Sequence, residues 1–441
     1  MLYSITTCLA AFAGLLYLLR RDTLSLGLPI AYLTGLLLIH LPGACVYLIP
    51  GADNVLQDLD FTVLGIHYTA IGAVCFLAGV ALSRYPALVV SEYSAKNRHQ
   101  FYLFCLIAGW IFTYGLSWLG RIPTLSAAIE KGGAVWMLGV MLGLRSAILS
   151  KDLGKSAMWV AALAVYPILM LLLGGFLSYG STATIIVLSL LTISTRSVHQ
   201  VVVGVLMAAF LGFNIFLNYF EHRDQIRYTV WGGAAIEDRV DVTLNIFREF
   251  KWFDPTNDQQ LTAVDQRLNQ NYFAGLAATR IDDGQVDYLY GRSLWEGLIS
   301  LVPRYFWPEK PVFGGSPKIV SEMTGLVLSE TTSFGVGNVM EFQINFGTPG
   351  VVVGFLALGW LIGFLDRRAA LADCRGDLGQ VFIFFLPAVA LIQPNGSLVE
   401  LASGSAAALV AAHGWKSGWA MWLRRDFLHS TSPKVDVLTN L

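Results

Sequence analysis

Hydrophobic runs long enough to cross a bilayer recur along this chain, and they constrain its fold more than any other feature. A helix that crosses the hydrocarbon core needs about 20 mostly apolar residues, and we find about eleven such stretches. Of the 441 residues, 55% are hydrophobic and only 13% are charged, which is more apolar than a water-soluble fold requires. The sequence therefore predicts an all-α polytopic membrane protein, with candidate spans near residues 2–19, 25–49, 61–83, 101–120, 134–149, 157–177, 182–195, 200–219, 347–365, 378–394 and 397–412.

Two of these runs need a closer interpretation. The run at 182–195 is short and follows a Gly-Gly pair, so a re-entrant segment is an alternative to a span. The run at 2–19 has no basic residues before it, and Arg20 and Arg21 come after it. Because a cleavable signal peptide carries its basic residues first, we interpret this run as a retained span.

Basic residues in the short connections alternate between the two sides of the membrane. Lys and Arg near span ends are retained in the cytoplasm, so the connections rich in these residues mark the cytoplasmic side. The loop at 121–133, with Arg121 and Lys131, is the exception. An odd count of about eleven spans then puts the N-terminus outside and the tail inside. The basic connections contain Arg20, Arg21, Arg84, Lys96, Arg98, Lys151, Lys155, Arg196, Arg367, Arg368 and Arg375.

One long polar segment, residues 220–346, divides the chain. Residues 1–219 hold about eight spans, residues 347–412 hold the remaining spans, and residues 413–441 form a cytoplasmic tail. The spans on either side put this segment on the extracytoplasmic face. Loops longer than about 15 residues are usually functional or disordered, and the many aromatic residues of this one argue against disorder.

Helical periodicity predicts three helices in this segment, over residues 236–250, 265–276 and 293–302. The first has acidic residues in its first turn and an apolar stripe, so we expect it along the membrane surface.

The segment Gly291–Pro311, GRSLWEGLISLVPRYFWPEKP, joins an amphipathic helix to a proline-rich turn. Its aromatic residues suit the headgroup region of a bilayer. Arg304 and Lys310 beside them can clamp the pyrophosphate of a lipid carrier. An interfacial anchor with snorkelling basic side chains is the alternative interpretation.

Upstream, the stretch QRLNQNY around Arg267 combines a guanidinium with the side chains that sugars need. Asn269 and Asn271 supply donors and acceptors, and Tyr272 supplies a stacking face. These residues fit a glycan cleft, and they fit ordinary helix capping equally well. Other arginines of the segment, Arg292 among them, alternate with acidic residues, and most of these are expected to be paired or solvated.

Two residues are candidates for a general base. Glu341 precedes the span at 347–365, and a carboxylate near the bilayer surface can hold a proton more tightly than in water; capping of a helix end is the alternative. His222, beside Arg223 at the exit of the span at 200–219, is the rival candidate. HExxH, CxxC, GxSxG and Walker-type phosphate loops do not occur, which argues against an ATP-driven pump. We predict no metal site and no cofactor.

The arrangement of these motifs resembles the Wzy-type polymerases of oligosaccharide repeat units in bacterial envelopes. The resemblance rests on the many spans, the late polar segment, RLNQN at 267–271, LVPRYFWPEKP at 301–311 and EFQINFGTPG at 341–350. It covers mainly residues 236–365, because the earlier spans offer only hydropathy.

The resemblance implies a C-type membrane glycosyltransferase fold in the bacterial inner membrane, with the large loop in the periplasm. It implies polymerisation of undecaprenyl-pyrophosphate-linked repeat units into a surface polysaccharide without metal. Arg304, Arg267, Lys310 and Arg292 would bind pyrophosphate, Glu341 or His222 would act in catalysis, and Asn269, Asn271 and Tyr272 would bind glycan.

The expected partners are a lipid-linked donor and acceptor, membrane lipid, a chain-length regulator and a repeat-unit flippase. The net charge of −1 gives no indication of nucleic-acid binding. Two alternatives stay open. One is an O-antigen ligase that transfers glycan to lipid A core, and the other is a flippase or transporter of lipid-linked oligosaccharide. Transporters more often carry ionisable residues near the middle of their spans, and this chain has almost none there.

Overall fold

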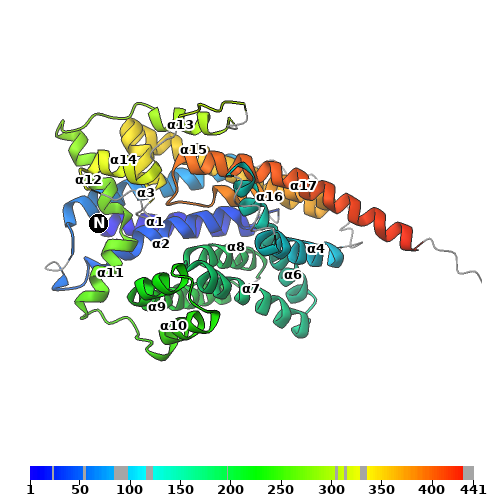
Figure 1. The fold of residues 1–441 in the computed structure, drawn as a ribbon. Coiled ribbons are helices and arrows are strands. Elements are labelled where there is room, and N and C mark those ends of the chain that lie inside the picture. The colour runs from blue at the N-terminus through cyan, green and yellow to red at the C-terminus, as the bar shows by residue number, and fades with distance from the viewer. Residues whose placement is uncertain are drawn as a thin grey trace, which may run out of the picture.

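The computed structural model is a bundle of helices, several of which lie along one common axis (Figure 1). It describes residues 1–21, 24–52, 56–83, 98–115, 123–195, 197–302, 306–311, 315–327 and 335–430. Within these ranges all regular structure is helical. The helices are α1 (Leu2–Arg21), α2 (Leu28–Val46), α3 (Leu59–Leu82), α4 (Arg98–Trp110) with the π-helical turn η2 (Ile111–Gly115), α5 (Pro123–Gly133), α6 (Val135–Leu149), α7 (Leu153–Gly174), α8 (Ser178–Ser194), α9 (Val198–Trp231), α10 (Ile236–Arg248), α11 (Asp258–Leu268), α12 (Gln270–Asp282), α13 (Arg292–Ser300), α14 (Gly315–Thr324), α15 (Asn338–Arg375), α16 (Leu378–Leu391) and α17 (Leu398–Ser430).

Among the described residues, 7 helices are long and apolar enough to cross a membrane, in Leu2–Arg20, Leu28–Val46, Leu59–Leu82, Ala128–Leu149, Leu153–Gly174, Val198–Trp231 and Asn338–Arg375. Gly180–Ser194 and Leu378–Leu391 are shorter apolar helices. The structure is therefore that of an all-helical, membrane-embedded protein. The count of about eleven spans stays a prediction.

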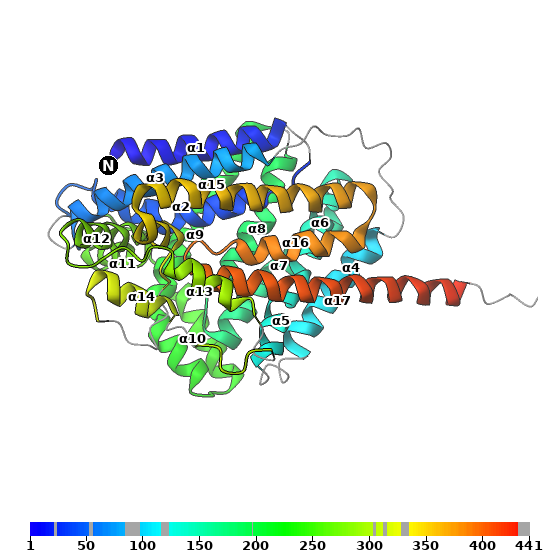
Figure 2. The same cartoon turned by 90° about the horizontal axis from the view of Figure 1, so that it is seen from above.

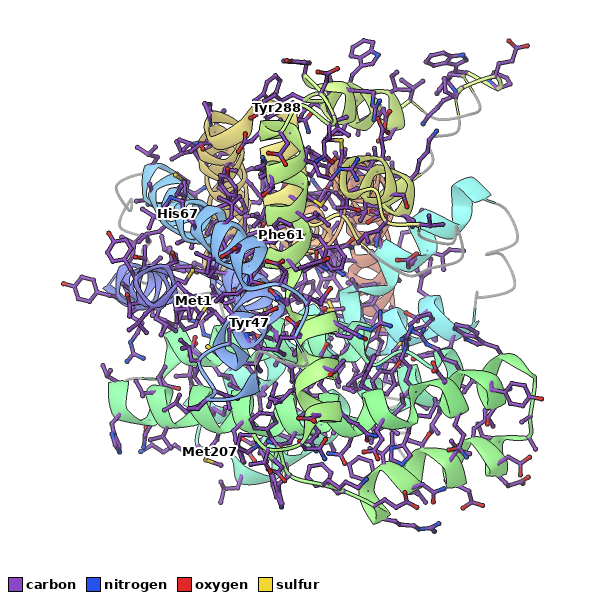
Figure 3. All side chains as sticks on the ribbon, turned by 90° about the vertical axis from the view of Figure 1, so that its left-hand side faces the viewer. Met1, Tyr47, Phe61, His67, Met207 and Tyr288 are labelled. Atoms are coloured by element: carbon purple, nitrogen blue, oxygen red, sulfur yellow. The ribbon has the colours of Figure 1, made fainter. Side chains whose placement is uncertain are left out.

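The two ends of the bundle differ. The N-terminus lies at one end together with α11, α12 and α14, whereas α17 runs away from that end and projects beyond the rest at the other (Figures 1 and 2). We call the first of these the cap end. Met1, Tyr47, Phe61 and Tyr288 all lie on it, and α11 and α12 follow one another across it (Figure 3).

Helix α12 is seated on the bundle through close backbone contact with α3. A Cβ atom on Gly275 of α12 would lie 1.9 Å from the carbonyl oxygen of Phe61, and one on Gly65 of α3 would lie 2.0 Å from the carbonyl oxygen of Asn271. Only glycine fits at such distances. These contacts fix the cap helix on the spans below it.

Helix α9 is longer than the apolar run from which it was expected. The run was placed at 200–219, but the helix continues to Trp231 without a break. It lies obliquely to the other helices: α9 and α10 extend sideways across the view of Figure 3, which looks at the bundle from the cap end. The first residues of the polar segment are thus a rigid extension of a span.

The bounds of the other helices in the polar segment agree in part with those predicted from the sequence. The helices expected over 236–250 and 293–302 are present as α10 and α13. The helix expected over 265–276 is instead two helices, because Asn269 leaves the helical conformation with φ −124 and ψ 64. Helix α14 was not expected.

Helix α15 is kinked where the polar segment ends. Phe346 and Gly347 have non-helical dihedral angles, and Gly347 has a φ of 64, which favours glycine. The part before the kink packs under the cap, and the part after it runs beside α3 (Figure 2).

Buried carboxylates of α15 hold the opposite end of the bundle. Asp366 accepts hydrogen bonds from the Ser25 hydroxyl at 2.6 Å and from the Leu26 amide at 3.0 Å. Asp373 forms a buried ion pair with Arg98, with 2.7 Å between Oδ1 and the guanidinium. Helices α2 and α4 are thereby fixed against α15.

Candidate functional site

Three half-buried arginines gather at the cap end, and we call them the arginine triad: Arg223 and Arg227 on α9, and Arg267 on α11. Burial and then the like charges of Arg223 and Arg227 lower the pKa of Arg267, and Asp224 offsets this only in part. The three charges therefore act on one another. In the ranges that the structure describes, no carboxylate comes within ion-pair distance of any of the three.

Aromatic rings support the triad. The guanidinium carbons of Arg267 and Arg223 lie 5.1 Å and 5.8 Å from the centre of the Phe220 ring. Arg227 lies 4.8 Å from the Phe176 ring and 5.3 Å from the Trp231 ring. Such contacts partly stabilise a guanidinium. A ring does not replace a hydrogen-bond acceptor, and in the described part of the chain the buried Nε atoms of Arg227 and Arg267 have none.

Two asparagines of α9 explain why the chain returns to this place after α10. The side chain of Asn218 bonds the Lys251 backbone at both its amide and its carbonyl, each at 2.8 Å. One turn earlier, the Asn214 side chain accepts a hydrogen bond from the Phe253 amide at 2.7 Å. Both asparagines are buried. Because the chain is held against α9 here, α11 begins beside it and brings Arg267 to Phe220.

Helix α11 is fixed on its other side by the buried carboxylate of Asp265. This group accepts hydrogen bonds from the Gln57 amide at 2.7 Å and from the Asn269 side chain at 2.6 Å. It also lies 3.3 Å from the Tyr47 hydroxyl at the end of α2. The helix that carries Arg267 is therefore braced between α9 and the bundle.

His222 lies on the same turn of α9 as Arg223. Its Nδ1 is 2.9 Å from the Asn218 carbonyl oxygen, and a carbonyl only accepts, so Nδ1 carries hydrogen. Its Nε2 is 3.4 Å from a carboxylate oxygen of Glu249. Nε2 is therefore the ring atom left to exchange a proton, and it donates to the Glu249 carboxylate only when it carries that proton.

Asn269 and Asn271, predicted to bind glycan, are buried in the protein at 1% and 0% exposure. Asn269 donates to the Thr62 hydroxyl at 2.9 Å, and Asn271 donates to the His40 carbonyl at 2.7 Å. Tyr272 is half-buried, edge-on to Phe61. In this conformation both amides connect the cap to α2 and α3, and their role in binding glycan stays a prediction.

Glu341, the other predicted base, lies before the kink of α15 and is fully buried. One carboxylate oxygen accepts a hydrogen bond from the Leu398 amide at 2.7 Å, at the start of α17. The other has no partner among the described residues. A carboxylate at a helix N-terminus is stabilising, so this contact is that of a helix cap, and the role of Glu341 as a base stays a prediction.

The basic residues expected around the proline-aromatic turn have other partners. Arg292 lies 2.7 Å from a carboxylate oxygen of Glu322 on α14. Lys310 donates to the carbonyls of Ser300 and Val302, each at 2.9 Å, at the end of α13. Arg304 lies outside the described residues.

The predicted site residues thus fall into two groups. Arg267 and His222 lie together where α9 meets α11, whereas Glu341, Arg292 and Lys310 lie where α13 meets α15 and α17. Arg223 and Arg227 were expected to be paired or solvated. One sequence feature could have identified them. Arg223 and Arg227 are four residues apart and follow the apolar run directly, so a helix that continues beyond the run puts both on one face. The described residues contain no cluster of three or more His, Cys, Asp or Glu that could hold a metal ion.

Comparison with known proteins gives no relative: no family model, no curated protein and no solved structure matches the chain.

Proposed function

We propose that this membrane protein is a glycosyltransferase that polymerises undecaprenyl-pyrophosphate-linked oligosaccharide repeat units at the periplasmic face of the bacterial inner membrane. One observation carries the proposal: the arginine triad has no carboxylate partner in the described residues and lies at the cap end of an apolar bundle. Guanidinium groups without a carboxylate at ion-pair distance, at the end of an apolar bundle, are suited to a multiply charged anion that a lipid carries.

The proposed reaction needs little beyond this. A hydroxyl of the acceptor glycan attacks the anomeric carbon of the donor, the bond to the pyrophosphate oxygen breaks, and undecaprenyl pyrophosphate leaves. The triad stabilises the charge that develops on the leaving oxygen, and such donors typically contribute factors of about 10²–10³ in rate. The activation is already present in the donor, so no nucleotide is required.

We assign the acceptor proton to Nε2 of His222. This atom lies on the same turn of α9 as Arg223, and Glu249 beside it can stabilise the charged ring. Glu341 is buried and bonded to the start of α17, and among the described residues its helix packs mainly against α3, α16 and α12. Its proposed role is to hold α17 in place.

The motif resemblance supports the same function. Within RLNQN, the arginine is Arg267, and the resemblance implies that this arginine binds pyrophosphate. The first asparagine of that motif, Asn269, is at the break between α11 and α12, and the second, Asn271, is in the first turn of α12. Arg304 of the second motif remains a proposed ligand.

Reconstitution of the full-length protein tests the proposal. Proteoliposomes would receive lipid-linked repeat units extracted from a strain that lacks this gene, with EDTA and without nucleotide. We expect a ladder of longer lipid-linked glycans, and its loss in Arg267→Ala. Arg248→Ala is the matched control, because Arg248 is an exposed arginine of α10 outside the triad. Unchanged single repeat units would contradict the polymerase. Transfer of glycan only after addition of lipid A core would indicate the ligase. Translocation of the lipid-linked repeat unit without bond formation would indicate a flippase.

A further inference from the structure

A groove lies next to the triad, between α9 and α11. Its volume is about 300 Å³, at the lower end of the roughly 300–1,000 Å³ typical of ligand sites. It is open to the surface. Its walls are formed by Phe220, Asp258, Gln259, Thr262, Ala263 and Gln266.

The groove follows from the amphipathic character of α11. Leu261, Val264 and Asp265 are buried against the bundle, so the opposite face of the helix is presented outward. That face carries side chains with amide, hydroxyl and carboxylate groups at helical spacing. Phe220 of α9 forms the apolar side of the groove and also supports Arg267.

Charge along the groove is graded. Gln266 is next to Arg267, so one end borders the triad, whereas Asp258 at the start of α11 is the one acidic side chain of the lining. The two ends are about 12 Å apart, by the rise of a helix over eight residues. An occupant with a phosphate at the Arg267 end therefore extends away from the triad over neutral amides.

We propose that this groove binds the pyrophosphate-proximal sugar of the lipid-linked donor, and that this sugar is an uncharged hexose or N-acetylhexosamine. The inference rests on the proposed function for the identity of the donor. Gln259 and Gln266 both donate and accept, as sugar hydroxyls require, and an aromatic wall suits the apolar face of a sugar ring. Asp258 would repel a carboxylated sugar.

Binding to the full-length protein in nanodiscs tests the inference with three synthetic probes. These are farnesyl pyrophosphate, the same lipid carrying one N-acetylglucosamine, and the same lipid carrying one glucuronic acid. We expect the N-acetylglucosamine probe to bind more tightly than both others. Gln259→Ala and Gln266→Ala should each weaken only this probe, by about three- to tenfold. Arg267→Ala should weaken all three.

Gln285→Ala is the control, because Gln285 is exposed in the turn after α12, outside the groove. Equal affinity of the three probes, or no effect of either groove variant, would overturn the inference. Because the measurement needs no bond formation, it separates the two proposals. Sugar-dependent binding without polymer formation would support the sugar-binding groove and contradict the polymerase. Polymer formation with sugar-independent binding would support the polymerase and contradict the sugar-binding groove.

Discussion

The guanidinium of Arg267 lies over the ring of Phe220, with 5.1 Å between its central carbon and the ring centre. The first residue belongs to a cap helix and the second to the extension of a span. This contact joins them at the place where Arg223 also approaches the same ring. A cation–π contact can hold a guanidinium without neutralising its charge, so the positive charge remains for an anion.

The triad should be needed for activity and not for folding. Removing one guanidinium by Arg223→Ala, Arg227→Ala or Arg267→Ala should lower polymer formation about 100-fold or more, because a donor to the leaving group is lost. The melting temperature should stay within about 2 °C, since no ion pair is broken. Glycan ladders and thermal unfolding of the purified variants measure both. A strongly reduced melting temperature would show that the arginines are structural.

His222 should affect turnover more than binding. His222→Gln keeps a hydrogen-bonding side chain but cannot accept and release a proton, and general-base catalysis typically contributes about 10²–10⁴-fold. We expect the rate to fall accordingly while donor affinity is retained. His199→Gln, an exposed position near the other end of α9, is the control. Full activity of His222→Gln would assign the base elsewhere.

Two substitutions at Glu341 separate catalysis from capping. Glu341→Ala leaves the part-buried Leu398 amide without its acceptor, which should cost about 1–2 kcal/mol of stability. Glu341→Gln keeps an acceptor oxygen and should retain both the melting temperature and most activity. A stable but inactive Glu341→Gln protein would instead identify Glu341 as the base.

The Arg98–Asp373 ion pair should stabilise the end opposite the cap. Because both side chains are buried, Arg98→Met or Asp373→Leu alone leaves an unpaired charge and should destabilise by about 3–5 kcal/mol. The double variant removes both charges and should be more stable than either single variant. Thermal unfolding in detergent gives the double-mutant cycle, and additive losses would argue against a pair.

Topology can be tested from the two ends of the bundle. Two cysteine substitutions serve as probes. Gln285 is in the turn after α12 at the cap end and is changed to Cys, and Lys151 is in the connection between α6 and α7 and is also changed to Cys. In a background without the native cysteines, a membrane-impermeant maleimide should label the first in cells with a permeable outer membrane. It should label the second only after the inner membrane is opened. The reverse pattern would place the triad in the cytosol and end the proposed function.

The sequence predicted best what depends on local periodicity. Helix α10 and helix α13 lie close to the ranges expected from their apolar stripes. Hydropathy identified the membrane-embedded character for the same reason. The end of α9 was missed because hydropathy falls at residue 219 although helix formation does not, and a helix can leave the bilayer without ending.

The site was less predictable, because it depends on contacts between residues far apart in the chain. Nothing local distinguishes Arg223 and Arg227 from paired surface arginines. Their place beside a third positive charge depends on Asn214 and Asn218, which hold the returning chain against α9 where α11 begins. Glu341 is a different case, since its position before a span suggested a general base, its carboxylate bonds the start of α17, and its role in catalysis stays a prediction.

Because α9 is uninterrupted, its apolar half and the arginines at its other end belong to one rigid helix. Val198 to Trp231 form one helix without proline or a break, so its apolar half and the half that carries the triad tilt as one rod. A bilayer that is thinner or thicker changes the tilt of such a rod. If the arginine triad binds a lipid-borne ligand as proposed, its position relative to the lipid depends on how the apolar half of α9 lies in the bilayer, and polymer formation should then vary with acyl-chain length.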